Sequence, residues 1–549
     1  MSASNELLCT AAPPALTPHT TPCFHSYYYN TVPGKDMQDT VLDAVAYWKQ
    51  LGLPLRHLMY DSWFYWKECE AGSTNNTWLK CKGAVELWEP RPDVFPDGFD
   101  FKPPFPTALH NRWFSGTNNS YIKDLGFADS FIVEAAVDFA LPIKADVFTY
   151  LMGKAKDWGM VLYEQECVRP LPPPPQELSL AVRSPPPHPP PHSPTYSWLI
   201  TVYNTMNVTK SNVTAASDWL KAMADAATGL GITIQYCMPL PRHMLESTLH
   251  PAVTNARASG DYHPGADNWQ VGLSSLLYWA IGIAPSKDDW WTTETQPGNP
   301  YGDNPTEPNW QLQAFVIGLS TGPNGPSDGI GYTNASLVLS TVRADGLTLQ
   351  PDRPATTMDA ALAAVFTSKS GSAPDVRSTW TAYLGHSYRW HHLLATQLGE
   401  DFVLALSDLG PAGAAPAFAV FDWFAAGPGG SPLAVLPASN PRGALVIPAG
   451  QGQPSAPVHA HNVQHLLVVP QLPGGWWLYG EAGKVVPVSK QRISALQLLG
   501  DGFVATVQVV AGETVSMLVA GADGVLKGLA CTAAPVATLT CTKGACACA

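Results

Sequence analysis

Acidic side chains stand at the ends of short apolar runs in this sequence. Asp61 ends the run at 57–61, and Glu164 and Glu166 end the run at 160–166. Two carboxyl groups on opposite sides of an anomeric carbon can cleave a glycosidic bond, because one protonates the leaving oxygen while the other attacks the sugar or activates water. The residue types therefore make glycosidic-bond chemistry a candidate activity.

A further acid, Asp261, follows Arg257 across three small residues, Ala-Ser-Gly. This spacing suits a strand end at which a carboxylate is held beside a cation, and the small residues would let a substrate approach closely. The pattern Arg-x-x-x-Asp is common in proteins, so the composition of this stretch is weak evidence for a site when taken alone.

A helical pattern that ends in glycine and is followed by a short apolar run occurs three times. The glycine supplies the left-handed conformation that commonly ends a helix, and an apolar run after a helix is typical of a buried parallel strand. Repeated helix–strand units predict a (β/α) barrel whose chemistry lies at the carboxyl ends of the strands. The units are 38–51 with Gly52 and 57–61, 146–158 with Gly159 and 160–166, and 217–230 with Gly231 and 232–237.

The periodicity divides the chain into three expected regions. Residues 1–35 are an N-terminal extension, 36–353 form the catalytic barrel, and 354–549 form an all-β, sandwich-like domain in which short β-rich runs alternate with Gly/Pro turns. A proline-rich insertion at 169–196 interrupts the barrel directly after the Glu166 strand, and its composition predicts extended polyproline. The β-rich runs are 402–406, 417–424, 466–470 and 503–510.

The composition restricts the classes of partner. A net charge of −13 with only 31 Lys and Arg residues argues against nucleic acid and anionic membranes, which need a basic patch. No apolar run approaches the roughly 20 residues that span a bilayer. An oligosaccharide or other glycan is the expected partner, since the 19 Trp residues include candidates for stacking on sugars. The oligomeric state stays open.

No cofactor and no metal are expected. The sequence contains no Gly-x-Gly-x-x-Gly after a strand, no P-loop and no Gly-x-Ser-x-Gly elbow. His459, His461 and His465 have a spacing that could place imidazoles on one strand face, but they lie in the expected β domain with no acidic neighbour.

Two features point to a secreted or luminal protein, although no signal peptide is visible. Ten cysteines include Cys69 with Cys81 and a cluster near the C-terminus, and in an oxidising compartment these would form disulfides. Glycosylation sequons are also present. The clustered cysteines are Cys531, Cys541, Cys546 and Cys548, and the sequons begin at Asn75, Asn118, Asn207, Asn212 and Asn334.

The stretch Arg257-Ala258-Ser259-Gly260-Asp261-Tyr262 resembles the Arg-x-Ser/Gly-Asp-Asp-Phe/Tyr motif of the α-galactosidase and raffinose-synthase type of glycoside hydrolase, with Gly260 in place of the first Asp. Other segments resemble further elements of that family, in its order and at similar distances, over about residues 60–354. These segments are 61–63, 95–98, 274–279, 285–288, 319–331 and 343–346.

The resemblance implies a (β/α)8 TIM barrel and retaining chemistry, with Asp261 as the acid/base. The family's nucleophile is an Asp two residues after a Lys at the end of strand four. Here Glu166 takes the Asp position and Glu164 the Lys position. Two features depart from the family: Glu166 is longer than the family's Asp, and Glu164 replaces the family's Lys. The second departure has a consequence for ionisation, because neighbouring carboxylates raise one another's pKa. Residues i and i+2 of a strand share a face, so both acids are expected to face one site.

We therefore expect a retaining glycosidase or transglycosylase acting on α-linked sugars, most specifically α-galactosides, with Glu166 and Asp261 as its catalytic residues. Two alternatives stay open: a catalytically impaired barrel that binds carbohydrate, and an inverting glycosidase in which one glutamate positions water. The residues expected to contact substrate are Asp61, Trp63, Trp113, Glu164, Arg257, Tyr262 and Asp328.

Overall fold

A computed structural model of the chain describes residues 25–28, 30–68, 83–99, 105–165, 206–265, 271–298, 306–364, 366, 375–396, 398–411, 413–423, 432–449 and 463–549. The proline-rich insertion, Glu166, and the cysteines at 69 and 81 lie outside these residues. The chain divides into two compact units. Unit 1 comprises 1–13, 60–103 and 107–261, and unit 2 comprises 14–59, 104–106 and 262–549.

Unit 1 is built on parallel strands with helices between them. Strands β4, β7, β8 and β9 pair in that order, each parallel to the next. Two antiparallel hairpins, β2 with β3 and β5 with β6, belong to the same unit. The strands are β2 (Tyr65–Lys67), β3 (Val85–Pro90), β4 (Thr107–Asn111), β5 (Phe131–Glu134), β6 (Phe139–Pro142), β7 (Met160–Gln165), β8 (Thr233–Tyr236) and β9 (Val253–Arg257).

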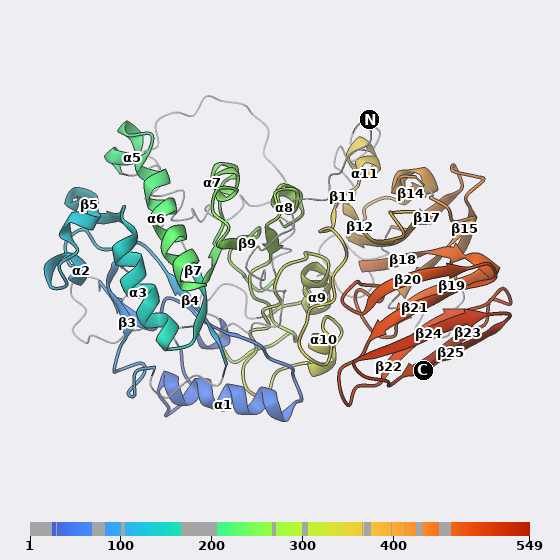
Figure 1. The fold of residues 1–549 in the computed structure, drawn as a ribbon, viewed down its shortest axis with the longest axis horizontal. Helices are drawn as coiled ribbons and strands as arrows, with labels where there is room; N and C mark the ends of the chain where they lie inside the picture. Colours follow the sequence, from blue (N-terminus) through green and yellow to red (C-terminus); the bar gives the residue numbers. More distant parts are fainter. Residues whose placement is uncertain are drawn as a thin grey trace. The chain divides into compact units, whose positions relative to one another are not determined.

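The two long helices of unit 1, α3 and α6, each bury one apolar side. Helix α3 buries residues at helical spacing, among them Phe148, Leu151 and Met152, and it packs against α6 (Figure 1). The expected helix–glycine–strand units are confirmed, since Gly159 has φ +97° and Gly231 has φ +67° where their helices end. The helices are α2 (Ser120–Lys123), α3 (Ala145–Asp157), α5 (Asn207–Ser211), α6 (Ala215–Leu230) and α7 (Pro241–Ser247), with 3-10 turns η3 (Ala128–Ser130) and η4 (Ala135–Val137).

The parallel sheet differs from the expected closed barrel. Its order is β1-β4-β7-β8-β9-β10, so six strands are paired within the described residues and the sheet does not close. Segment 319–331 forms no strand and contributes an isolated bridge between Trp290 and Pro326. The four glycines and two prolines in that segment explain this, because both residue types disfavour regular strands.

Unit 2 contains further helices and strands of the first half of the chain. Helix α1 begins after Asp36, whose side chain accepts a hydrogen bond from the Asp39 backbone N–H at 2.8 Å. The third helix–glycine–strand unit is confirmed here, since Gly52 has φ +72°. The elements are η1 (His25–Tyr27), α1 (Met37–Gln50), β1 (Leu58–Tyr60, whose last residue belongs to unit 1), α8 (Val271–Ala280), β10 (Ala284–Ser286), α9 (Trp310–Gly318) and α10 (Ala335–Leu339).

The C-terminal part of unit 2 is antiparallel, as the sequence predicts. One sheet has nine strands and another, β20-β21-β24-β25, has four. The elements are β11 (Thr356–Thr357), α11 (Asp359–Ala364), β12 (Asp375–Tyr383), β13 (Tyr388–Thr396), β14 (Phe402–Ala405), η5 (Leu406–Leu409), β15 (Ala417–Asp422), β16 (Ala434–Pro437), β17 (Ala444–Ile447), β18 (Val463–Leu472), η6 (Pro473–Gly475), β19 (Trp476–Glu481), β20 (Ile493–Leu499), β21 (Gly502–Gln508), β22 (Val515–Ala520), β23 (Leu526–Cys531), β24 (Val536–Thr542) and β25 (Ala545–Cys548).

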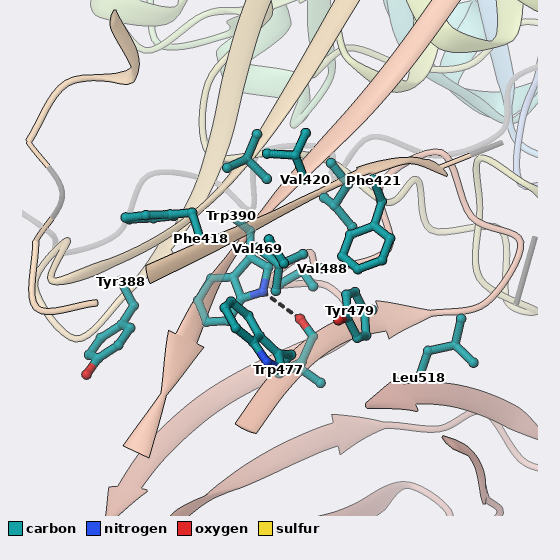
Figure 2. Close-up of a cluster of buried hydrophobic side chains, with 14 of the residues drawn as sticks. Tyr388, Trp390, Phe418, Val420, Phe421, Val469, Trp477, Tyr479, Val488 and Leu518 are labelled. Atoms are coloured by element: carbon teal, nitrogen blue, oxygen red, sulfur yellow. Dashed lines mark hydrogen bonds between the residues drawn. The ribbon is translucent and has the colours of Figure 1, made fainter. Parts of the chain in front are cut away.

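Side chains from both of these sheets join one apolar core. Figure 2 shows its centre, where the Trp390 indole N–H donates to the Leu478 carbonyl oxygen at 2.7 Å. Phe421 meets Tyr479 edge-on, with ring centres 4.5 Å apart. The hydrogen bond matters because a buried indole N–H without an acceptor would destabilise the fold.

Four C-terminal cysteines form two disulfides, Cys531 with Cys548 and Cys541 with Cys546. The first joins the end of β23 to the end of β25, and the second closes the turn between β24 and β25. No helix in the described part of the chain is both long enough and apolar enough to cross a membrane.

Candidate functional site

A row of polar side chains crosses four strands of unit 1 at one level. The strand register places His110 beside Glu164, Glu164 beside Gln235, and Gln235 beside Asn255. All four are buried. The preceding residue of β7, Tyr163, packs its ring on Phe148 of α3. Because side chains alternate along a strand, Glu164 and its row lie on the face opposite α3.

Hydrogen bonds connect this row. Gln235 Nε2 donates to Glu164 Oε1 at 2.7 Å, and Asn255 Nδ2 donates to Gln235 Oε1. The amide of Gln235 thus fixes Glu164 and is itself fixed by Asn255. A chain of this kind restricts the rotamers of every member, because each lost contact would leave a buried polar atom unpaired.

Asp61 lies at the other end of the row. Its Oδ1 lies 4.0 Å from His110 Nδ1, and that nitrogen is 3.0 Å from the Tyr65 hydroxyl. Burial raises the pKa of Asp61, but His110, the Ser62 backbone N–H and Arg112 outweigh burial and hold the pKa below its ordinary value. The Asp61 side chain is 33% exposed, so an ionised carboxylate is accessible here.

His110 is uncharged at neutral pH. Burial lowers its pKa to about 3, against an opposing contribution from Asp61, and the charges of Arg112, Lys67 and Arg257 add to the lowering. The contact with Asp61 is therefore a polar contact rather than an ion pair. The imidazole can donate one hydrogen bond and accept another, as the neutral ring requires.

Arg257 and Asp261 form an ion pair just beyond the end of β9. Their side chains are 7% and 10% exposed, respectively. The backbone between them carries no large side chain, since residues 258–260 are Ala, Ser and Gly. The sequence expectation that Arg257 holds this carboxylate beside a cation agrees with this geometry.

The two tryptophans expected to stack on sugar are buried. Trp63 is fully buried and stacks on Phe95 with ring centres 6.0 Å apart. Trp113 is 5% exposed, with the Arg112 guanidinium 5.1 Å from its ring and Phe139 edge-on. In this structure neither ring presents an open face, and a role of either ring in binding sugar stays a prediction.

Tyr262 and Asp328, the expected contacts in unit 2, are also buried. The Tyr262 hydroxyl donates to Glu307 Oε2 at 2.6 Å. Asp328 accepts from the Thr292 backbone N–H and hydroxyl, both at 2.7 Å, and from Gln296 Nε2 at 2.6 Å. Burial raises the pKa of Asp328 to about 7 even though these donors lower it. These contacts hold Asp328 in place, and its role as a substrate contact stays a prediction.

Glu307, Gln235 and Asn255 are the polar residues that sequence reasoning missed. Burial raises the pKa of Glu307, although Tyr262 and two backbone N–H groups lower it. A usable signal for the other two was present, because a polar residue recurs near the end of each strand. The strand 232–237 was interpreted as an apolar run, which hid Gln235.

Among the described residues, no group of three or more His, Cys, Asp or Glu side chains could hold a metal ion. His465 is buried and stacks on His392 with ring centres 5.7 Å apart, while His459 and His461 lie outside the described residues. Glu166, the expected nucleophile, also lies outside them.

No protein-family model matches the sequence, and no curated protein matches it either. The solved structures similar to it include glycoside hydrolases. An α-galactosidase from Lactobacillus brevis has a TM-score of 0.49 and 10% identity, over 83% of this chain and 55% of that one. An α-galactosidase from Saccharomyces cerevisiae with raffinose has a TM-score of 0.44 and 10% identity, over 83% of this chain and 98% of that one.

A glycoside hydrolase family 97 enzyme from Pseudoalteromonas sp. strain K8, in complex with acarbose, has a TM-score of 0.37 and 9% identity, over 83% of this chain and 60% of that one. This chain thus spans little more than half the length of the Lactobacillus enzyme. These similarities concern the fold and assign no activity to this chain.

Proposed function

We propose that this protein is a glycosidase acting on α-linked sugars, with α-galactosides as the substrate class. The observation that carries the proposal is the buried ion pair of Arg257 with Asp261, beyond the end of a parallel strand and within the motif that resembles the α-galactosidase family. Carboxylates at such strand ends are where enzymes of this architecture place their chemistry.

The proposed mechanism is a double displacement. Glu166 attacks the anomeric carbon while Asp261 protonates the leaving oxygen, and Asp261 then deprotonates the incoming water or sugar acceptor. Arg257 keeps the Asp261 carboxylate in one position between the two steps. Asp61, ionised and partly exposed, accepts hydrogen bonds from sugar hydroxyls.

Glu164 supports this site rather than reacting. Its carboxylate is 5% exposed and accepts a hydrogen bond from Gln235, so its orientation is set by the protein.

The test is a panel of nitrophenyl glycosides with the purified protein, followed by NMR of the first-formed anomer. The proposal expects turnover of the α-galactoside and first release of the α-anomer. Release of the β-anomer would contradict retention and favour the inverting alternative, in which a glutamate positions water. No turnover of any α-glycoside would contradict the enzymatic proposal.

The second candidate, a carbohydrate-binding protein, is favoured by one observation. Glu164 stands where the family has a lysine, so the cation that keeps the family's nucleophile ionised is replaced by a carboxylate at that position. Binding of galactosides measured by calorimetry, together with no turnover in the wild type, would support this candidate.

We also propose that the protein is secreted or luminal. The two C-terminal disulfides support this, because disulfides persist in oxidising compartments. Three of the described sequon asparagines, Asn118, Asn207 and Asn212, are exposed and so could accept a glycan.

A further inference from the structure

A tryptophan on the antiparallel sheet of unit 2 is contacted by two arginines. The Arg389 guanidinium carbon lies 5.1 Å from the centre of the Trp380 ring, and the Arg353 guanidinium carbon lies 5.9 Å from it. The His386 ring meets the same indole edge-on, with centres 5.1 Å apart. We call Arg353, Trp380, His386 and Arg389 the Trp380 cluster.

The cluster brings together residues from separate parts of unit 2. Trp380 lies on β12, and Arg389 lies on β13 opposite Ala382, so both side chains share one face of the hairpin. His386 lies in the turn that joins these strands, with φ +68°. Arg353 precedes β11, and its carbonyl oxygen accepts a hydrogen bond from the Thr379 hydroxyl at 2.5 Å.

The two arginines of the cluster have no carboxylate partner among the residues that the structure describes. The Nε atom of each is buried and makes no hydrogen bond there. Nearby acids are engaged elsewhere: Asp352 pairs with Lys490 at 2.7 Å, and Asp375 pairs with Arg377 at 2.9 Å.

The cluster therefore carries positive charge without a counter-charge in contact. Burial lowers the pKa of Arg353, and the charge of Arg389 adds to this against a smaller opposing contribution from Asp359. His391, directly opposite Trp380 in the strand register, has its pKa lowered to about 3 by burial and by the same two arginines. Because the chain has 44 acidic and 31 basic residues, this imbalance does not come from a shortage of acids.

Two guanidinium groups held over an indole are suited to one class of ligand. Guanidinium presents N–H donors in a planar fork that matches carboxylate, sulfate and phosphate oxygens. Contact with Trp380 restricts the orientation of both guanidinium groups before a ligand binds, which reduces the entropy lost on binding. An anion would also supply hydrogen-bond partners for the buried Nε atoms of both arginines.

We propose that the Trp380 cluster is a binding site for an oxyanion, the class that includes inorganic sulfate and phosphate and the carboxylate of an acidic sugar. Arg353 and Arg389 bind the anion, and Trp380 holds them in place. The site needs neither Asp261 nor Glu166, so it stands or fails independently of the glycosidase proposal.

The test measures the Tm of the full chain by calorimetry while sulfate replaces chloride at constant ionic strength. The proposal expects Tm to rise with sulfate and saturate at millimolar concentration, with a total shift of about 2 °C or more. Galacturonate distinguishes the sources: a saturable shift that Arg353→Gln and Arg389→Gln remove assigns the site to acidic sugars as well as free anions, whereas a shift that both variants keep places galacturonate binding elsewhere and restricts the site to free anions. A Tm that rises linearly with sulfate and does not saturate overturns the proposal, since kosmotropic salts stabilise proteins without a binding site. No rise in Tm overturns it as well.

Variants separate binding from packing. Arg353→Gln and Arg389→Gln should each lose most of the saturable shift, while Arg442→Gln, an exposed arginine on a neighbouring loop, should keep it. Without anion, each cluster variant should unfold no earlier than the wild type, because the substitution removes like-charge repulsion. A cluster variant that loses stability yet keeps the sulfate response would mean that the arginines only pack on Trp380, and would overturn the proposal.

Discussion

At the scale of single residues, the candidate site depends on polar side chains that hold one another in place. Asp61 and Asp261 were predicted from the sequence because acids at strand ends are conspicuous. Gln235 was not, because it lies in the otherwise apolar run 232–237, although a polar residue recurs near the end of each of these strands. Only the strand register revealed that it joins Glu164 to Asn255.

Replacing Gln235 by Leu should destabilise the protein by about 1–3 kcal/mol, because Glu164 and Asn255 would each lose a buried partner. Urea unfolding measures the loss. Gln497→Leu, an exposed glutamine on β20, is the matched control and should change stability by less than about 0.5 kcal/mol. Equal losses in the two variants would contradict a role for the amide chain.

Asp328 predicts a specific pH dependence of stability. Its pKa is about 7 in the folded protein and ordinary when unfolded, so the folded state binds more protons between these values. Stability should therefore fall as pH rises from about 4 to 7, by roughly 1.4 kcal/mol per pH unit from this group. Asp328→Asn should be less stable than the wild type at pH 4, but its free energy of unfolding should change less between pH 4 and pH 7. An unchanged slope would contradict the buried, raised-pKa carboxyl.

At the scale of elements, the sequence predicted the helix–glycine–strand units well. Helical spacing and a terminal glycine are local signals, and α3 with Gly159 and α6 with Gly231 carry both. Closure of a barrel depends on long-range pairing that no local pattern reports. The strands expected after β10 are therefore where the fold prediction and the described sheet differ.

The end of α6 offers a matched pair of glycines. Gly231 has φ +67°, so Gly231→Ala should destabilise by about 1 kcal/mol because the left-handed conformation opposes a Cβ. Gly229 lies within the helix with open space around it, so Gly229→Ala should stabilise by about 0.4–1 kcal/mol. Thermal unfolding of both variants measures the difference, and the same sign in both would contradict this account.

At the scale of the whole molecule, the two disulfides stabilise the C-terminal strands to different degrees. Cys531–Cys548 spans 17 residues and Cys541–Cys546 spans 5. Because the entropy removed from the unfolded chain grows with loop length, losing the longer loop should cost about 3 kcal/mol and losing the shorter one less. Denaturant unfolding of the double serine variants measures both, and a larger loss for the shorter loop would contradict the loop-length argument.

The composition predicted the partner class only by exclusion. A net charge of −13 argues against nucleic acid and anionic membranes as partners, but it does not select a sugar. The specific proposal comes from the Arg257–Asp261 motif and its position at the end of a parallel strand. The burial of Trp63 and Trp113 could not be predicted, because a sequence does not distinguish a buried tryptophan from an exposed one.

The most direct test of the central claim is the Asp261→Asn variant on aryl α-galactosides whose leaving groups differ in acidity, with Asp157→Asn on the exposed end of α3 as control. The account predicts a loss of about 10²- to 10⁴-fold in kcat/KM for poor leaving groups and a much smaller loss for activated ones, since only the former need protonation. Wild-type rates for every leaving group in Asp261→Asn would contradict Asp261 as the acid/base.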